Sequence, residues 1–448
     1  MKKFISTLKN IYSIPDLRTR IGNTLLFILI YRIGSYVVLP GIDPGKLDAL
    51  QAQSADGILG LISMFTGGAF SNASIFALGI MPYISASIVL QLAGLAVPAL
   101  QKMQREGESG RKKITQYTRY LTIIICGFQG PGYIANLMST LPADAFLIDP
   151  SFFWFSSWLI LITGTVFVMW LGEKITDKGI GNGISLLIMI GIIAQLPFAT
   201  MAEFGTRMTG GNGGLVIFIL EIAALMIVIT ACIMLVQGTR RIPVQVARAA
   251  ISGRTPLPQG GARQYIPLKV NAAGVMPIIF AQAIMFVPVT LGSYASDGTS
   301  AFVTAFSDFG GFWYNLVFAI LIIVFTYFYT AITINPNQMA EDMKRNGGFI
   351  PGIKPGKRTA EYLDNIMSRI TLPGSIFLAF VAIMPAFAMM FGVNMQFSQF
   401  YGGTSLLIMV GVVLDTLQQV ESHLLMRHYD GLMKTGKIKG RSSMSMAG

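Results

Sequence analysis

The chain has little charge and few of the side chains that perform acid–base or metal chemistry. Of its 448 residues only 12% are charged, two are histidine and two are cysteine. Two cysteines, both inside apolar runs, are too few for a disulfide framework. No histidine–cysteine cluster has the spacing of metal ligands, and neither a phosphate-binding loop nor a G-x-S-x-G motif occurs. We therefore expect no metal, no cofactor and no enzymatic activity.

Apolar residues make up 53% of the chain and fall into runs long enough to cross a bilayer. A helical crossing takes about 20 residues. The sequence predicts an all-α polytopic membrane protein, and its ten spans are expected at residues 21–38, 74–97, 117–138, 153–171, 184–200, 214–236, 272–291, 313–333, 371–391 and 403–420. The first span is too long for a cleaved signal peptide. Residues 3–13 before it suit either a short surface helix or a disordered leader.

Basic residues are distributed unevenly between the two ends of these spans. All but Arg32, Lys46 and Arg207 of the 33 lysines and arginines precede span one or follow the even-numbered spans. By the positive-inside rule, these segments and both termini are cytoplasmic. Arg32 lies near the outer end of span one, where we expect it to snorkel to the surface. Carboxylates within the spans are scattered, and for Glu221 we expect a structural hydrogen bond.

Two apolar hexapeptides recur in the same order about half a chain apart. Residues 79–84 (GIMPYI) return as 274–279 (GVMPII), and residues 183–188 (GISLLI) return as 403–408 (GTSLLI). The charge distribution makes the paired spans run in opposite directions, which predicts two inverted halves of five spans around a central pore. The expected divisions are residues 1–20 (cytoplasmic), 21–200, 201–421 and 422–448 (cytoplasmic). Glycine and Leu-Leu-Ile are also common in membrane helices, so composition alone is the alternative explanation.

The repeats place isoleucines at matching positions. They align Ile84 with Ile279 and Ile188 with Ile408. Ile80 and Ile184 lie four residues before Ile84 and Ile188, so each shares a helix face with the later isoleucine. Because β-branched side chains are stiff, a ring of them would form a narrow apolar constriction that resists wetting. The candidates are Ile80, Ile84, Ile184, Ile188, Ile279 and Ile408. Isoleucines in membrane spans also commonly face lipid or pack against neighbours, and this alternative remains open.

Three segments between the spans have unusual composition. Residues 57–68 are apolar but too short to cross a hydrocarbon core of about 30 Å, which favours a re-entrant helix entering from outside. An interfacial helix on the outer leaflet is the alternative. Residues 237–270 and 334–370 are long, basic and rich in glycine and proline. Their charge suits acidic proteins or phosphate backbones, unless it serves only to set topology.

The chain resembles the SecY family of protein-conducting channels over nearly its whole length. The motifs that carry this resemblance lie at residues 31–34, 39–43, 74–87, 106–111, 116–120, 179–185 and 402–408. The resemblance implies passage of unfolded secretory proteins across a bacterial cytoplasmic (inner) membrane. It also implies release of membrane segments sideways into lipid through a lateral gate between spans two/three and seven/eight.

The resemblance also assigns residues and partners. The six isoleucines become the pore ring, and the segment at 57–68 becomes the plug, with Phe65, Gly67 and Gly68 matching. The gate's polar cluster matches Ser85, Gln129 and Asn271. Cytoplasmic docking maps onto Arg240, Arg241, Lys344, Arg345, Lys354, Lys357 and Arg358. The implied partners are the small SecE and SecG subunits, the SecA motor ATPase, the ribosome with its RNA, signal sequences, nascent chains and membrane lipid.

One docking residue departs from the family pattern. Lys354 stands in a turn where the family often has arginine, so the bidentate fork is lost while the charge is kept. Contact with a phosphate or carboxylate is expected to be weaker there.

Two other classes of protein suit a chain of this kind less well. An ion-coupled transporter with inverted repeats would need a midplane carboxylate or an unwound binding site, and no relay of carboxylates crosses the spans. An intramembrane enzyme would need a catalytic pair in apposed spans. His423 and His428 both follow the last span and are not placed for that role.

Overall fold

The structure is a computed structural model, and it describes residues 14–47, 50, 51, 60, 63–209, 214–246, 263–271, 273–282, 284, 285 and 310–434. The chain forms two compact units. Unit 1 comprises residues 1–50, 65–191 and 412–448, and unit 2 comprises residues 51–64 and 192–411. The predicted leader at residues 3–13 lies outside the described residues, as does the tail from residue 435 onward.

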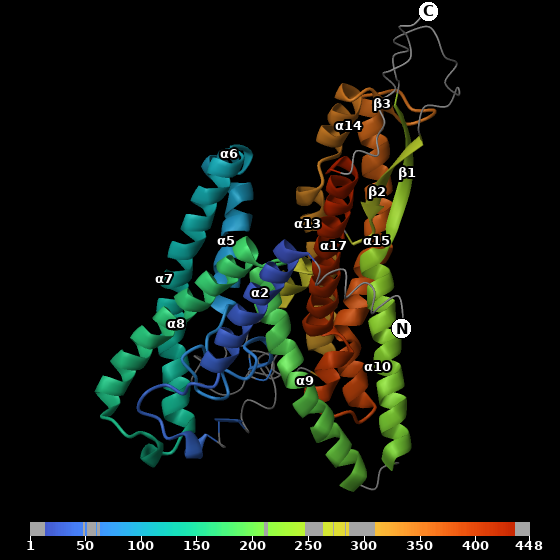
Figure 1. The fold of residues 1–448 in the computed structure, drawn as a ribbon. Coiled ribbons are helices and arrows are strands. Elements are labelled where there is room, and N and C mark those ends of the chain that lie inside the picture. The colour runs from blue at the N-terminus through green and yellow to red at the C-terminus, as the bar shows by residue number, and fades with distance from the viewer. Residues whose placement is uncertain are drawn as a thin grey trace, which may run out of the picture. The chain divides into compact units, whose positions relative to one another are not determined.

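Unit 1 is built mainly from long helices (Figure 1). Helices α5 and α6 pack against α7, α7 packs against α8, and α2 packs against α8. The helices are α2 (Pro15–Gly34), α5 (Met81–Ala96), α6 (Pro98–Arg105), α7 (Glu108–Thr140) and α8 (Pro150–Lys178), with the short turns η1 (Pro44–Lys46) and η2 (Ala143–Ala145). Helix α9 (Gly183–Thr209) begins in unit 1 and ends in unit 2, and α17 (Gly403–Lys434) does the reverse.

Unit 2 combines long helices with a small sheet. Its helices are α10 (Gly214–Gln237), α13 (Phe312–Thr333), α14 (Pro336–Arg345), α15 (Lys357–Met390), α16 (Met395–Ser398) and the turn η3 (Gln399–Tyr401). Residues 276–282, 284 and 285 are also helical. Helix α15 is the centre of this packing, since it contacts α10, α13, α14, α16 and η3.

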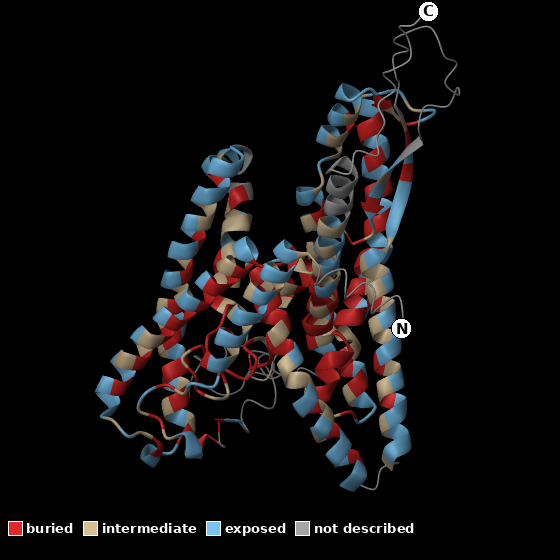
Figure 2. Ribbon diagram, in the orientation of Figure 1, coloured by how far each residue is buried: buried red, intermediate tan, exposed pale blue. Residues whose placement is uncertain are grey.

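Within the described ranges, seven helices are long and apolar enough to cross a membrane. They correspond to the predicted spans three to six and eight to ten. Large hydrophobic side chains lie exposed on these helices; Phe128, for example, is 81% exposed. Figure 2 shows exposed and half-buried residues along the lengths of the long helices. Such surfaces are costly in water and suit contact with lipid, so the chain is an all-helical multi-pass membrane protein apart from its small sheet.

The predicted start of span two at residue 74 is wrong, because α5 begins at Met81. Residues 75–80 form turns instead, and they follow Ala73, which adopts a φ of 45°. Gly79 then adopts a φ of 53°, which a right-handed helix does not allow. The apolar composition of residues 74–80 reflects burial, since Phe76, Ala77, Leu78 and Ile80 are all buried.

The long basic segments contain a sheet that the sequence did not predict. Strands β1 (Thr239–Val246), β2 (Arg263–Lys269) and β3 (Gly348–Phe349) are antiparallel in the order β2-β1-β3. Along β1, Arg241 and Pro243 are exposed while Ile242 and Val244 are buried, which is the alternation of a half-buried strand. Pro243 is tolerated because β3 pairs only with Gln245 and Val246, leaving that side of Pro243 unpaired.

Candidate functional site

The first repeated hexapeptide has the same backbone in both copies. Gly79 and Gly274 have φ values of 53° and 64°, and each lies two residues before a helix that carries proline as its second residue. Glycine adopts this left-handed conformation without the cost that a Cβ imposes. Proline in the first helical turn sacrifices no hydrogen bond. The repeat therefore encodes a turn followed immediately by a helix.

The second repeated hexapeptide also marks helix starts. Gly183 is the first residue of α9, and Gly403 is the first residue of α17. At α9 the side chain of Asn182 accepts hydrogen bonds from the backbone N–H groups of Ile184 and Ser185, at 3.2 and 3.5 Å. This N-cap satisfies donors that the helix itself leaves unpaired.

All six candidate isoleucines lie at helix starts, and four of them occupy matching positions of the repeats. Ile84 and Ile279 are each the fourth residue of their helices, while Ile188 and Ile408 are each the sixth. Ile80 immediately precedes α5, and its carbonyl accepts a hydrogen bond from the Ile84 N–H at 3.0 Å. Ile80, Ile188 and Ile408 are buried, and the others are half-buried. Ile279 and Ile408 belong to unit 2, and the other four belong to unit 1.

The predicted plug is described only in part. Residues 57–59, 61 and 62 lie outside the described residues, residues 63–65 are helical, and residues 66–73 form turns. In unit 1 the Tyr31 hydroxyl donates to the Thr66 carbonyl at 3.2 Å, and Arg32 Nη1 donates to the Gly67 carbonyl at 2.9 Å. In unit 2 the Ser405 hydroxyl donates to Met64 Sδ at 3.3 Å. Helix α2 and the start of α17 thus each hold one part of this segment.

Arg32 does not simply extend toward a membrane surface, as the sequence suggested. Its second nitrogen donates to the Tyr36 hydroxyl at 3.1 Å, and its guanidinium lies 5.2 Å from the Tyr36 ring centre. These contacts fix the side chain toward the turn at Gly67. No sequence pattern pointed to this contact, because the partner is a backbone carbonyl 35 residues away.

The three residues assigned to the gate have different surroundings. Half-buried Ser85 donates to the Met81 carbonyl of its own helix at 3.1 Å, and Gln129 is exposed on α7. Asn271 in unit 2 is buried, and its Oδ1 has no hydrogen-bond partner among the described residues. An unpaired buried amide oxygen costs free energy, so Asn271 is poised to accept a further hydrogen bond.

The seven basic residues assigned to docking are all exposed and all belong to unit 2. They lie on β1, at the end of α14, in the following loop and in the first turn of α15. Beneath them is an apolar core formed by Ile242, Val244, Leu268, Ile350, Leu363, Ile366, Met367 and Ile370. No described carboxylate pairs with any of the seven. Lys357 and Arg358 add charge to the already positive N-terminus of α15, which favours an anionic partner.

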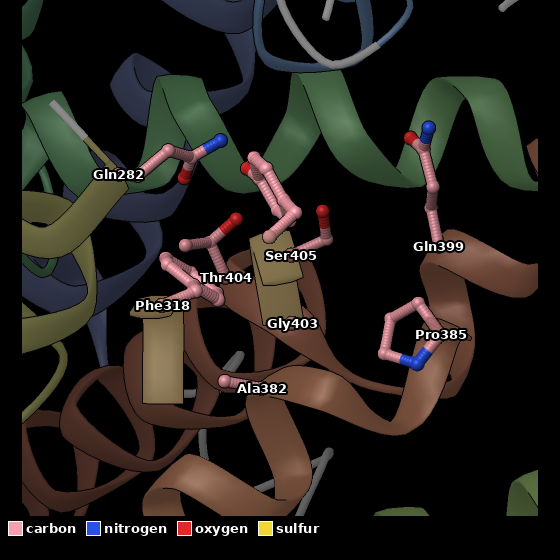
Figure 3. A pocket seen from close by; sticks show the side chains of 9 residues that line it. Gln282, Phe318, Ala382, Pro385, Gln399, Gly403, Thr404 and Ser405 are labelled. Carbon is pink, nitrogen blue, oxygen red and sulfur yellow. The ribbon is translucent and has the colours of Figure 1, made fainter. Parts of the chain in front are cut away.

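A small cavity of about 20 Å³ lies in unit 2 beside the start of α17. Figure 3 shows Gln282 and Gln399 at opposite ends of its lining, with Thr404 and Ser405 between them. The cavity has room for about one water molecule and is far smaller than a typical ligand pocket. Within the described part of the chain, no group of three or more histidines, cysteines or carboxylates is placed to hold a metal ion.

Sequence reasoning missed one buried ionic cluster in unit 2. Arg207 lies between Glu203, four residues earlier on α9, and Glu221 on α10. The four-residue spacing of Glu203 and Arg207 was the available signal. Glu221 therefore makes the structural hydrogen bond that we expected, and the donor is the charged side chain of Arg207.

Long apolar helices with exposed hydrophobic faces and helix starts repeated in two copies define a multi-pass helical membrane protein. The chain belongs to the SecY family, whose model matches residues 74–417. It is 42% identical over 438 residues to protein translocase subunit SecY of Streptomyces scabiei, covering 94% of this chain and 98% of the relative. The corresponding subunit of Escherichia coli strain K12 is 40% identical over 431 residues, covering 95% and 96%.

Solved structures agree on the fold. A SecY channel whose plug domain stabilises the closed state matches with a TM-score of 0.63 at 18% identity, covering 94% of this chain and 95% of that one. Sec61 in the canine ribosome–channel complex matches with a TM-score of 0.59 at 17% identity, covering 94% and 95%. The chain is therefore a protein translocase channel subunit and not an enzyme, as the sequence led us to expect.

Proposed function

We propose that this chain forms the pore of a bacterial translocase, with two inverted halves that contribute matching isoleucines to one constriction. The observation that carries this proposal is the equal placement of Ile84 with Ile279 and of Ile188 with Ile408 in their helices. In an inverted repeat, equal offsets from helix starts would put the two members of each pair at equivalent positions. A constriction of stiff apolar side chains would limit water and ions without binding any particular substrate sequence.

The segment around residues 57–68 is proposed to be the plug that closes this constriction. Its support is the pair of backbone contacts from Tyr31 and Arg32, and the contact of Ser405 with Met64. A hydrogen bond in a protein contributes about 1 kcal/mol net, so a few such contacts hold the segment while leaving it able to open. Displacement of the plug would accompany entry of an unfolded chain.

A lateral gate is proposed between spans two/three and spans seven/eight. A signal sequence would separate these elements, and sufficiently apolar segments would partition into lipid. Asn271 supports this role because its buried amide oxygen lacks a described partner. Ser85 and Gln129 are the proposed polar groups on the opposing helices.

The exposed basic residues of unit 2 are proposed to dock cytoplasmic partners, namely a ribosome or the SecA motor. Support comes from their exposure, from the lack of described carboxylate partners, and from Sec61, which is found in a ribosome–channel complex. SecE and SecG are the proposed small subunits. The proposed location is the bacterial cytoplasmic membrane, with both termini inside.

The decisive experiment is reconstitution of the purified chain, with its copurifying subunits, into vesicles. We expect ATP-dependent passage of an unfolded precursor into the lumen when the SecA motor is added. Omitting ATP and using a folded, cross-linked precursor are the controls. Gradient-driven uptake of a small solute, without any passage of the precursor, would favour a secondary transporter instead.

A further inference from the structure

Three ionisable side chains are buried together in unit 2. Arg207 Nε lies 2.8 Å from Glu203 Oε1, and Arg207 Nη2 lies 2.6 Å from Glu221 Oε1. The exposed fractions of the side chains are 8% for Arg207, 0% for Glu203 and 7% for Glu221. Ionisable groups buried in a membrane chain are costly, so a cluster of this kind needs a specific account.

Further hydrogen bonds connect the cluster to neighbouring segments. Arg207 Nη2 also donates to the Gly392 carbonyl at 2.6 Å, just beyond α15. The Asn394 backbone N–H donates to Glu203 Oε2 at 2.8 Å, and the Tyr401 hydroxyl donates to the main-chain carbonyl of Glu221 at 2.6 Å. The cluster thus ties together α9, α10 and the chain between α15 and α17.

One carboxyl oxygen of the cluster has no hydrogen-bond partner among the described residues. Both Glu203 oxygens accept hydrogen bonds, one from Arg207 and one from Asn394. Glu221 Oε1 accepts from Arg207, whereas Glu221 Oε2 is buried and has no partner among the described residues.

The charges of the cluster do not balance if every group is ionised. Two carboxylates and one guanidinium leave one negative charge, and an uncompensated buried charge costs several kcal/mol. The charged and titratable groups that act on Glu221 are Glu203, Arg207 and Tyr401. Burial, followed by the nearby carboxylates, raises the pKa of the Tyr401 hydroxyl, so Tyr401 stays neutral and offers no compensation.

We propose that the cluster is a binding site for one proton, carried on Glu221 Oε2 at neutral pH. The proton makes the cluster electrically neutral and converts the orphaned oxygen into a donor. Glu203 then keeps its hydrogen bonds from Arg207 and Asn394. Protonation of carboxyl pairs that share one site is a general way to avoid two like charges at close range.

Infrared spectroscopy of the purified complex in vesicles tests the proposal directly. We expect a carbonyl stretch of a protonated carboxylic acid at neutral pH that disappears in Glu221→Gln. Glu173→Gln is the matched control, because Glu173 pairs one-to-one with Arg119 through two hydrogen bonds of 2.7 and 2.9 Å. Absence of the band from the wild type, or its persistence in Glu221→Gln, would overturn the proposal.

Thermal unfolding supplies a second, independent readout. Glutamine is isosteric with a protonated glutamate, so Glu221→Gln is expected to unfold within a few degrees of the wild type at neutral pH. Glu203→Gln replaces one of the two oxygens that accept from Arg207 and Asn394 with an NH2 donor, and it is expected to unfold at a clearly lower temperature. A loss in Glu221→Gln equal to that in Glu203→Gln, or failure of Glu221→Gln to accumulate in membranes, would show that Glu221 must be charged and would refute the proton site.

Discussion

The side chain of Gln419 accepts a hydrogen bond from the backbone N–H of Gly181, at 2.8 Å, although 238 residues separate them. The bond joins the later turns of α17 to the loop that enters α9, all within unit 1. It is one contact between the later part of the last predicted span and the unit that contains the first four. Since α17 begins in unit 2, the same helix belongs to both units.

Replacing Gln419 by alanine is expected to lower the stability of unit 1 by about 1 kcal/mol, because the buried Gly181 N–H loses its acceptor. Gln418→Ala is the matched control, since Gln418 is exposed and has no described contact of this kind. Thermal unfolding of the purified complex measures the difference. Equal losses in the two variants would contradict a specific role for the Gly181–Gln419 bond.

The two repeated glycines offer a comparison between strain and crowding. Alanine at Gly79 or Gly274 must adopt a positive φ, which costs about 1 kcal/mol. A Cβ at Gly79 would also lie 3.0 Å from Thr66 Cγ2, whereas no atom of the described residues lies within 4 Å of one at Gly274. We therefore expect Gly79→Ala to unfold at a lower temperature than Gly274→Ala. The reverse order would mean that packing at Thr66 does not constrain this turn.

Arg32 is expected to limit ion leak through the idle channel by its hydrogen bond to the Gly67 carbonyl. Arg32→Ala should raise ion leak through vesicles holding the idle channel, since the turn at Gly67 loses its donor. Tyr36→Phe removes only the other acceptor of Arg32 and is expected to leak little. An Arg32→Ala channel that holds an ion gradient as well as the wild type would refute this holding role.

A polar side chain at Ile408 is expected to favour the open channel, because a polar constriction wets more readily. Ile408→Asn should increase export of a reporter with a defective signal sequence, and a tenfold increase corresponds to about 1.4 kcal/mol. Ile408→Val keeps an apolar branched side chain and should export like the wild type. Unchanged export by Ile408→Asn at normal protein levels would count against a place for Ile408 in the constriction.

Charge reversal on β1 tests the docking surface. The double variant Arg240→Glu/Arg241→Glu should weaken ribosome binding by at least tenfold at low salt and by less at high salt, because screening weakens charge–charge attraction. Lys112→Glu/Lys113→Glu makes the same change of charge at exposed positions of α7. Similar losses in both variants, measured by co-sedimentation, would indicate a general charge effect and not a docking surface.

The sequence predicted those features whose signal is local. Helices α7, α8, α10 and α13 cover their predicted spans because long apolar runs need helical hydrogen bonding in lipid. The repeated Gly-x-Met-Pro motif marked two helix starts because glycine and proline act on their own backbone. In contrast, Ala73 and the buried residues that follow it form turns under tertiary constraint, so the apolar pattern alone misplaced the start of α5.

Contacts between distant residues could not be read from the sequence. Arg32 donates to a backbone carbonyl, and any residue presents the same group. Glu221 looked isolated because its partner Arg207 belongs to another helix. Strand β1 was hidden because Pro243 and the basic residues obscured an alternation only a few residues long. The buried side of that strand becomes evident only with α15 packed against it.

The order of synthesis has a consequence for the apolar core under the basic surface. Strands β1 and β2 can pair once residue 269 has left the ribosome, but their cover on α15 extends to Ile370, about 100 residues later. At roughly 5–20 residues per second, that interval is about 5–20 seconds. During it, Ile242, Val244 and Leu268 lack this apolar cover. We therefore expect newborn chains to be sensitive to proteases and aggregation in this interval, which ends before the ninth span is complete.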